Sequence, residues 1–116
     1  MRIVEITPSY SVSPQIAASE VAEIAAQGFR SIMCNRPDGE DPAQPDVAVV
    51  RAEAERLGLA FAFVPVISGG ITPENVEDFG EALDTLPAPV LAYCRSGARC
   101  QNLFLLSQHG RAVQSR

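Results

Sequence analysis

The chain has 116 residues, of which 47% are hydrophobic and 20% charged, so it should fold as a single domain rather than stay disordered. Nine Lys and Arg against 14 Asp and Glu leave a net charge of −5, which argues against nucleic acid as a partner. No apolar run reaches the roughly 18 residues of a membrane helix, and "MRIVEITPSY" lacks a cleavable apolar stretch. We therefore expect a cytoplasmic protein with no membrane partner.

Short strands are predicted at residues 2–6 and 10–13, and a helix follows within residues 19–29. Gly28 stands where the C-terminus of that helix needs a left-handed residue. A further helix should begin after Thr72, which is a typical N-cap, with Pro73 in its first position. From residue 30 onward strands and helices alternate: strand 30–34, loop 35–45, helix 46–58, strand 59–66, helix 72–86, strand 88–94 and helix 99–110.

This alternation predicts an α/β fold with three layers, in which helices flank a central and mostly parallel sheet. We expect one domain over residues 1–116, with a frayed end at 110–116. The stretch "VLAY" carries no charge, as a central strand buried on both faces requires. Ligands of such sheets bind beyond the carboxyl ends of the strands. Cys94 follows one such end, and the loops after Cys34 and Val66 should open on the same edge.

The stretch "CRSGAR" combines a cysteine, a glycine and an arginine between the last strand and the last helix. A turn into a helix directs backbone N–H groups and the positive end of the helix dipole at one point. A cysteine at that point loses its proton readily, so Cys94 is the predicted nucleophile. Arg99 would clamp an anion with its planar guanidinium. The residues between them form the predicted anion-binding loop: Arg95, Ser96, Gly97 and Ala98.

The remaining cysteines are most simply packing residues, because buried thiols behave as small hydrophobic groups. Cys100 falls in the first turn of the last helix, where it could approach Cys94 and resolve a persulfide or sulfenic acid. Three cysteines without zinc-ligand spacing, and a single His109, predict neither a metal site nor a disulfide framework. We predict no cofactor.

The Cys-x-x-Gly-x-Arg pattern resembles the active loops of cysteine-dependent phosphatases and of rhodanese-type sulfurtransferases. With "NRPDGE" and "FVPV", the stretch "CRSGAR" makes residues 1–110 resemble the bacterial β-lactamase-hydrolase-like protein, phosphatase-like domain family. That resemblance implies a fold like that of the dual-specificity and tyrosine phosphatases. It also implies a persulfide-handling metallo-β-lactamase-fold enzyme as a partner, fused to such domains or encoded beside them.

Two features favour sulfur transfer over phosphate hydrolysis. Phosphatases of the resembled class place their arginine seven residues into the loop, whereas Arg99 is sixth and Cys100 is seventh. Such phosphatases also use an acidic residue upstream to protonate the leaving oxygen, and residues 57–73 contain neither Asp nor Glu. Loss of that acid slows expulsion of an alkoxide by about 10²–10⁴-fold. A thiol leaving group does not need the proton.

The loop at residues 35–45 offers the phosphatase interpretation an alternative acid. It follows another strand and should overhang the same edge, so its carboxylates could reach the site. Asp38, Glu40 or Asp41 could then act as the general acid, and Arg36 could add positive charge. The simpler interpretation is a solvated turn around Asp38-Gly39. Arg95 could likewise attract anionic substrates or be an ordinary surface charge.

Three functions therefore remain open. The favoured one is sulfur transfer through a persulfide on Cys94, acting on a small thiol or persulfide. The first alternative is hydrolysis of phosphomonoesters through a phosphocysteine on Cys94. The second is a weakly active module that binds a small oxyanion.

Overall fold

The computed structural model describes the backbone of residues 1–114 and the side chains of residues 1–109. Residues 110–114 continue the last helix, and 115–116, part of the predicted frayed end, lie outside the described residues. No helix in the described part of the chain is long and apolar enough to cross a membrane. The elements, in chain order, are β1 (Val4–Thr7), β2 (Tyr10–Ser13), η1 (Ala18–Glu20), α1 (Val21–Ala26), β3 (Ser31–Cys34), α2 (Val47–Arg56), β4 (Ala60–Phe63), α3 (Pro73–Thr85), β5 (Val90–Tyr93) and α4 (Ala98–Gln114).

A five-stranded sheet forms the middle layer, with strand order β1-β2-β5-β3-β4. Only β1 runs antiparallel to its neighbour; the other pairs are parallel. The uncharged strand β5 lies at the centre, as its composition predicts. Tyr93 at its carboxyl end pairs with Ser13 on β2 and with Cys34 on β3. These strands therefore end level with one another, directly before Cys94, which confirms the predicted edge.

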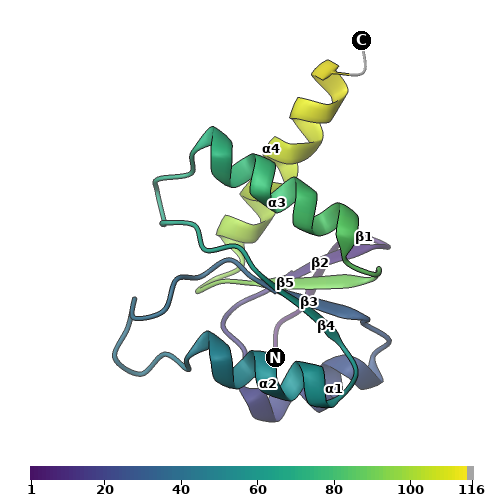
Figure 1. The fold of residues 1–116 in the computed structure, drawn as a ribbon, viewed down its shortest axis with the longest axis vertical. Coiled ribbons are helices and arrows are strands. Elements are labelled where there is room, and N and C mark those ends of the chain that lie inside the picture. Colours follow the sequence, from purple (N-terminus) through teal and green to yellow (C-terminus); the bar gives the residue numbers. More distant parts are fainter. Residues whose placement is uncertain (115–116) are drawn as a thin grey trace.

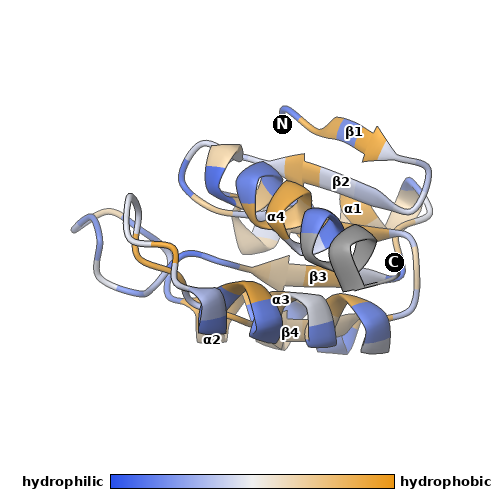
Figure 2. Cartoon of the chain, turned by 90° about the horizontal axis from the view of Figure 1, so that it is seen from above, coloured by the Kyte–Doolittle hydropathy of each residue, from blue (hydrophilic) through white to orange (hydrophobic). Residues whose placement is uncertain are grey.

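Helices cover both faces of the sheet, with α3 and α4 on one face and α1 and α2 on the other (Figure 1). The alternation of side chains along β5 accounts for the two cores. Val90 and Ala92 join the core under α3 and α4, whereas Leu91 and Tyr93 join the core over α1 and α2. Figure 2 shows that α3 and α4 each carry both hydrophobic and hydrophilic residues, and Phe79 of α3 and Leu103 of α4 are buried in the core beneath them. The three-layer α/β prediction is confirmed.

The segment after β4 differs from the predicted strand 59–66, because the strand ends at Phe63. Beyond Phe63 the regular parallel register is lost, because the next two hydrogen bonds advance two residues on this segment but only one residue on the β3 side. The chain nevertheless stays tied to the sheet edge, since the Val64 N–H donates to Cys34 O at 2.9 Å and the Val66 N–H to Asn35 O at 3.0 Å. The following loop leads into α3, whose predicted Thr72 cap is confirmed: Thr72 Oγ1 accepts from the Asn75 N–H at 3.1 Å.

Candidate active site

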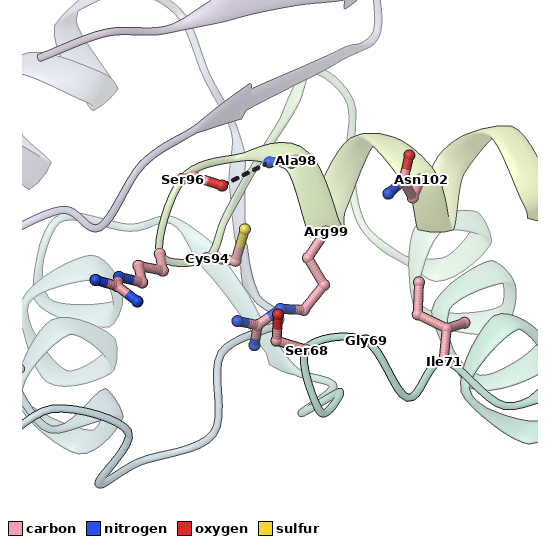
Figure 3. Close-up of a pocket in the computed structure, with 9 residues that line it drawn as sticks. Ser68, Gly69, Ile71, Cys94, Ser96, Ala98, Arg99 and Asn102 are labelled. Atoms are coloured by element: carbon pink, nitrogen blue, oxygen red, sulfur yellow. Dashed lines mark hydrogen bonds between the residues drawn. The ribbon is translucent and has the colours of Figure 1, made fainter.

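The loop after β5 turns through Cys94–Gly97 and enters α4 at Ala98 (Figure 3). Gly97 makes the turn with a φ of 94°, which side-chain-bearing residues rarely adopt. A β-carbon there would lie 3.5 Å from the carbonyl of Ser13 on β2, an ordinary van der Waals contact, so the φ is what requires glycine. Ser96 holds the loop, as predicted, by accepting the Ala98 N–H on its Oγ at 3.3 Å.

Cys94 is buried, and its sulfur lies inside this loop. The Gly97 N–H donates to Sγ at 3.1 Å. Hydrogen bonds from the Cys100 thiol first, and then from the backbone N–H groups of Cys100, Gly97 and Ser96, lower the pKa of Cys94 to about 5 against the opposing effect of burial. Cys94 is therefore a thiolate at neutral pH, the form that attacks electrophiles.

Cys100 provides the neighbouring thiol, from the first turn of α4. Burial raises the pKa of Cys100 well above its usual value, and the adjacent Cys94 raises it further. Cys100 thus stays protonated, and its S–H group donates a hydrogen bond to the Cys94 thiolate. The Tyr10 hydroxyl anchors this turn by donating to Cys100 O at 2.9 Å. A resolving role for Cys100 stays a prediction.

Arg99 reaches the site from the same turn, and it is 8% exposed. Its Nη1 donates to Val66 O at 2.8 Å and to Glu40 Oε2 at 3.1 Å, and its Nη2 donates to Glu40 Oε1 at 3.2 Å. The buried Nε has no hydrogen-bond partner in the described part of the chain. Buried donors are almost always paired, so this N–H of a pocket-lining residue is an unsatisfied donor next to Cys94.

Glu40 was a predicted general acid, but its contacts assign it another role. It bridges two arginines, accepting from Arg36 Nε at 2.9 Å as well as from Arg99. Burial favours its neutral form, yet the hydrogen bonds from Arg99 and Arg36 outweigh burial and hold the pKa of Glu40 below its usual value. A carboxylate that resists protonation is a poor proton donor, so Glu40 positions Arg99.

The other residues predicted on that loop are also committed to structure. Asp38 Oδ1 accepts the Val47 N–H at 2.8 Å, at the start of α2. Asp41 Oδ1 accepts the Ala43 N–H at 3.0 Å within its own turn. Arg36 is buried between Glu40 and Gln15, whose Oε1 accepts from its Nη1 at 3.0 Å. Residues 38–43 are exposed, as the predicted solvated turn around Asp38-Gly39 requires, whereas Arg36 is buried and shares Glu40 with Arg99.

A pocket of about 630 Å³ opens beside Cys94. The loop after β4 supplies its opposite wall, as Figure 3 shows for Ser68, Gly69 and Ile71. Sequence reasoning placed this loop at the right edge but did not single out its residues, since small and apolar side chains carry no chemical signature. Asn102 was also missed, although it stands one helical turn after Ala98. The full lining comprises Ser68, Gly69, Ile71, Cys94, Arg95, Ser96, Ala98, Arg99 and Asn102.

Cys34 stays apart from this chemistry. It is buried, its thiol donates to Arg36 O at 3.3 Å, and burial raises its pKa. It therefore packs as predicted. Over residues 1–109, no group of three His, Cys, Asp or Glu side chains is arranged to hold a metal ion.

A mostly parallel sheet, a strand-to-helix loop and a thiolate within it define a phosphatase-like domain with a cysteine at its candidate site. The chain belongs to the family described as "Beta-lactamase hydrolase-like protein, phosphatase-like domain", whose model matches residues 2–111. A Beta-lactamase hydrolase-like protein of Xylella fastidiosa is 43% identical over 108 residues, which are 93% of this chain and 25% of that protein. The chain thus spans about a quarter of this relative.

Solved structures carry the same fold. A candidate phosphatase from Neisseria meningitidis superposes with a TM-score of 0.83 at 37% identity, covering 90% of this chain and 74% of that one. Tk-PTP in its active form superposes with a TM-score of 0.65 at 18% identity, covering 82% and 63% of the two chains, which shows the fold alone. The predicted family and cysteine-phosphatase-like fold are confirmed.

Proposed function

We propose that this chain is a phosphatase that hydrolyses phosphomonoesters through a phosphocysteine on Cys94. The observation that carries the proposal is the sulfur itself: a thiolate with a pKa of about 5, inside a ring of backbone N–H donors. The N–H groups that hold the thiolate also suit the oxygens of a phosphoryl group. The family description and the Neisseria meningitidis structure favour phosphatase chemistry over the sulfur transfer that the sequence favoured.

In this proposal the reaction has two steps. The Cys94 thiolate attacks phosphorus, the bond to the ester oxygen breaks, and its electron pair leaves with that oxygen. Water then attacks the phosphocysteine, which restores the thiolate and releases phosphate and a proton. The Arg99 Nε–H is free to donate to a phosphoryl oxygen in both steps, while Glu40 fixes the guanidinium from behind.

Sulfur transfer remains the second candidate, because one observation favours it. Arg99 follows Cys94 by five positions instead of six, so the loop has one N–H fewer than that of the phosphatases it resembles. A sulfane sulfur needs less room than three phosphoryl oxygens. The persulfide-handling partner expected from the sequence would belong to this second function.

Turnover of 4-nitrophenyl phosphate tests the proposal. Cys94→Ser should abolish release of nitrophenol, because a hydroxyl at that position does not ionise at neutral pH. Cys34→Ser is the matched control, since Cys34 is equally buried but lies outside the pocket, and we expect it to retain activity. Full turnover by Cys94→Ser would refute the assignment of the nucleophile.

A further inference from the structure

The proton supply of the pocket determines which esters this site can cleave. We propose that it selects phosphoryl donors whose leaving group departs as a stable anion, namely aryl phosphates, acyl phosphates and phosphoanhydrides, and that it discriminates against alkyl phosphates. This inference rests on the proposed phosphatase function and deepens it. It starts from the pocket lining, which holds a thiolate and two arginines but no carboxyl group.

The arginines cannot replace an acid. A guanidinium keeps its proton at any pH at which the protein functions, so neither Arg95 nor Arg99 can transfer one to a leaving oxygen. Both can stabilise an oxygen that leaves as an anion: Arg99 is buried beside Cys94, and Arg95 is exposed at the mouth of the same pocket. The electrostatics of the pocket therefore match a negatively charged leaving group.

The neighbouring loops supply no acid either. The wall opposite Cys94, residues 64–72, reads "VPVISGGIT" and carries no carboxyl group. On the loop after β3, Glu40 is paired with Arg36 and Arg99, and both Asp38 and Asp41 accept backbone N–H groups. Glu74 is the next carboxylate along the chain, in the first turn of α3, but it is exposed and does not line the pocket.

The consequence follows from the first chemical step. When the Cys94 sulfur bonds to phosphorus, the electron pair of the breaking P–O bond moves to the leaving oxygen. A phenolate, carboxylate or phosphate carries that charge in water without help, whereas an alkoxide needs a proton as it leaves. A positioned acid accelerates such a step by about 10²–10⁴-fold, and alkyl phosphates lose that factor here.

The test is the dependence of kcat/KM on the leaving group, measured with 2,4-dinitrophenyl, 4-nitrophenyl, phenyl, acetyl and glycerol phosphates. We expect kcat/KM to fall steadily as the pKa of the leaving group rises, with glycerol phosphate at least about 10²-fold below phenyl phosphate. Equal values for glycerol and phenyl phosphates would overturn the inference while leaving the phosphatase function intact. If no compound is hydrolysed, the proposed function itself fails.

Two substitutions separate an absent acid from a hidden one. Glu74→Gln should leave the leaving-group dependence unchanged, and a steeper dependence would identify Glu74 as an acid and contradict the proposal. Ser68→Asp should place a carboxyl group in the pocket wall, since Ser68 is an exposed lining residue that tolerates a larger side chain. Compared with the matched Ser68→Asn, it should raise kcat/KM for glycerol phosphate at least about tenfold, which is part of the roughly 10²–10⁴-fold that a well-positioned general acid contributes. Equal kcat/KM values for Ser68→Asp and Ser68→Asn would contradict the claim that a missing proton donor limits the hydrolysis of alkyl phosphates.

Discussion

Cys94 owes its low pKa first to another cysteine. The Cys100 thiol donates to the thiolate, and backbone N–H groups add to that effect. Burial of Cys100 keeps its proton in place, because the pKa of Cys100 is raised well above the usual value. A small hydrophobic packing residue thus acts as a hydrogen-bond donor at the site, which sequence spacing alone could not distinguish from packing.

Alkylation by iodoacetamide, followed by intact mass, tests this pair. The rate should rise with pH through about 5 and then level off, since only the thiolate reacts. Cys100→Ala removes the donor and should move that midpoint upward, towards the pKa of an ordinary thiol. Cys100→Ser keeps a donor and serves as the control with a midpoint close to the wild type. An unchanged midpoint in Cys100→Ala would show that the backbone N–H groups suffice.

Glu40 connects the stability of the protein to pH. Because the pKa of Glu40 is lower in the folded than in the unfolded state, its stabilising contribution is present above the unfolded pKa, about 4.3, and is lost as pH falls through the folded value. Glu40→Ala also removes the shared carboxylate acceptor of Arg99 and Arg36, which keep Val66 O and Gln15 Oε1, and it should cost about 1–3 kcal/mol of unfolding free energy at pH 7.

Urea denaturation at pH 7 and below pH 4 measures both effects. The difference between Glu40→Ala and the wild type should shrink at the lower pH. Glu55→Ala is the control, since Glu55 pairs with Arg51 at 3.5 Å in an exposed position and should contribute less than about 1 kcal/mol. A difference that is independent of pH would contradict the ionic role of Glu40.

At the scale of elements, the loop between β5 and α4 depends on one glycine. Gly97→Ala places a β-carbon at a φ of 94°, which costs about 1–3 kcal/mol, and 3.5 Å from the Ser13 carbonyl on β2. We expect lower stability and slower alkylation of Cys94. Gly58→Ala is the matched control, because Gly58 has a φ of 82° at the end of α2 but open space around it.

Thermal unfolding and the kinetics of iodoacetamide alkylation, measured on both variants, distinguish backbone strain at a positive φ from a change in the loop around Cys94. Gly58→Ala should lower Tm and leave the reactivity of Cys94 unchanged. Gly97→Ala should change both. Equal reactivity in the two variants would show that the N–H cradle tolerates a displaced Gly97.

Most elements could be predicted because their signals are local. The N-cap at Thr72, the turn at Gly28 and the buried strand β5 can each be predicted from a few neighbouring residues. The short β4 could not be predicted, since Phe63 and Val64 look equally suited to a strand. The regular pairing with β3 is lost because the Val64 and Val66 N–H groups bond to the consecutive carbonyls of Cys34 and Asn35. The Glu40–Arg99 pair also stayed hidden, because 59 positions separate its partners and neither side chain carries a sign of the other.

At the scale of the whole molecule, the sheet brings three separate loops to one edge. The loop after β3 contributes Glu40, the loop after β4 contributes Val66, and the loop after β5 contributes Cys94. Arg99 donates hydrogen bonds to Glu40 and to Val66 O, and it lines the pocket together with Cys94. The alternation of strands and helices predicts this convergence. It does not predict which carboxylates face the pocket, since each of Asp38, Glu40 and Asp41 found a structural partner instead.

The central claim is that Cys94 forms a phosphocysteine. It is tested most directly by the intact mass of the protein after reaction with 2,4-dinitrophenyl phosphate, thiosulfate or glutathione persulfide and a rapid quench. We predict that the first compound adds one phosphoryl group to the wild type and to Cys34→Ser, but not to Cys94→Ser. A gain of one sulfur atom from thiosulfate or the persulfide, with no phosphoryl adduct from the phosphate ester, would contradict the account in favour of sulfur transfer.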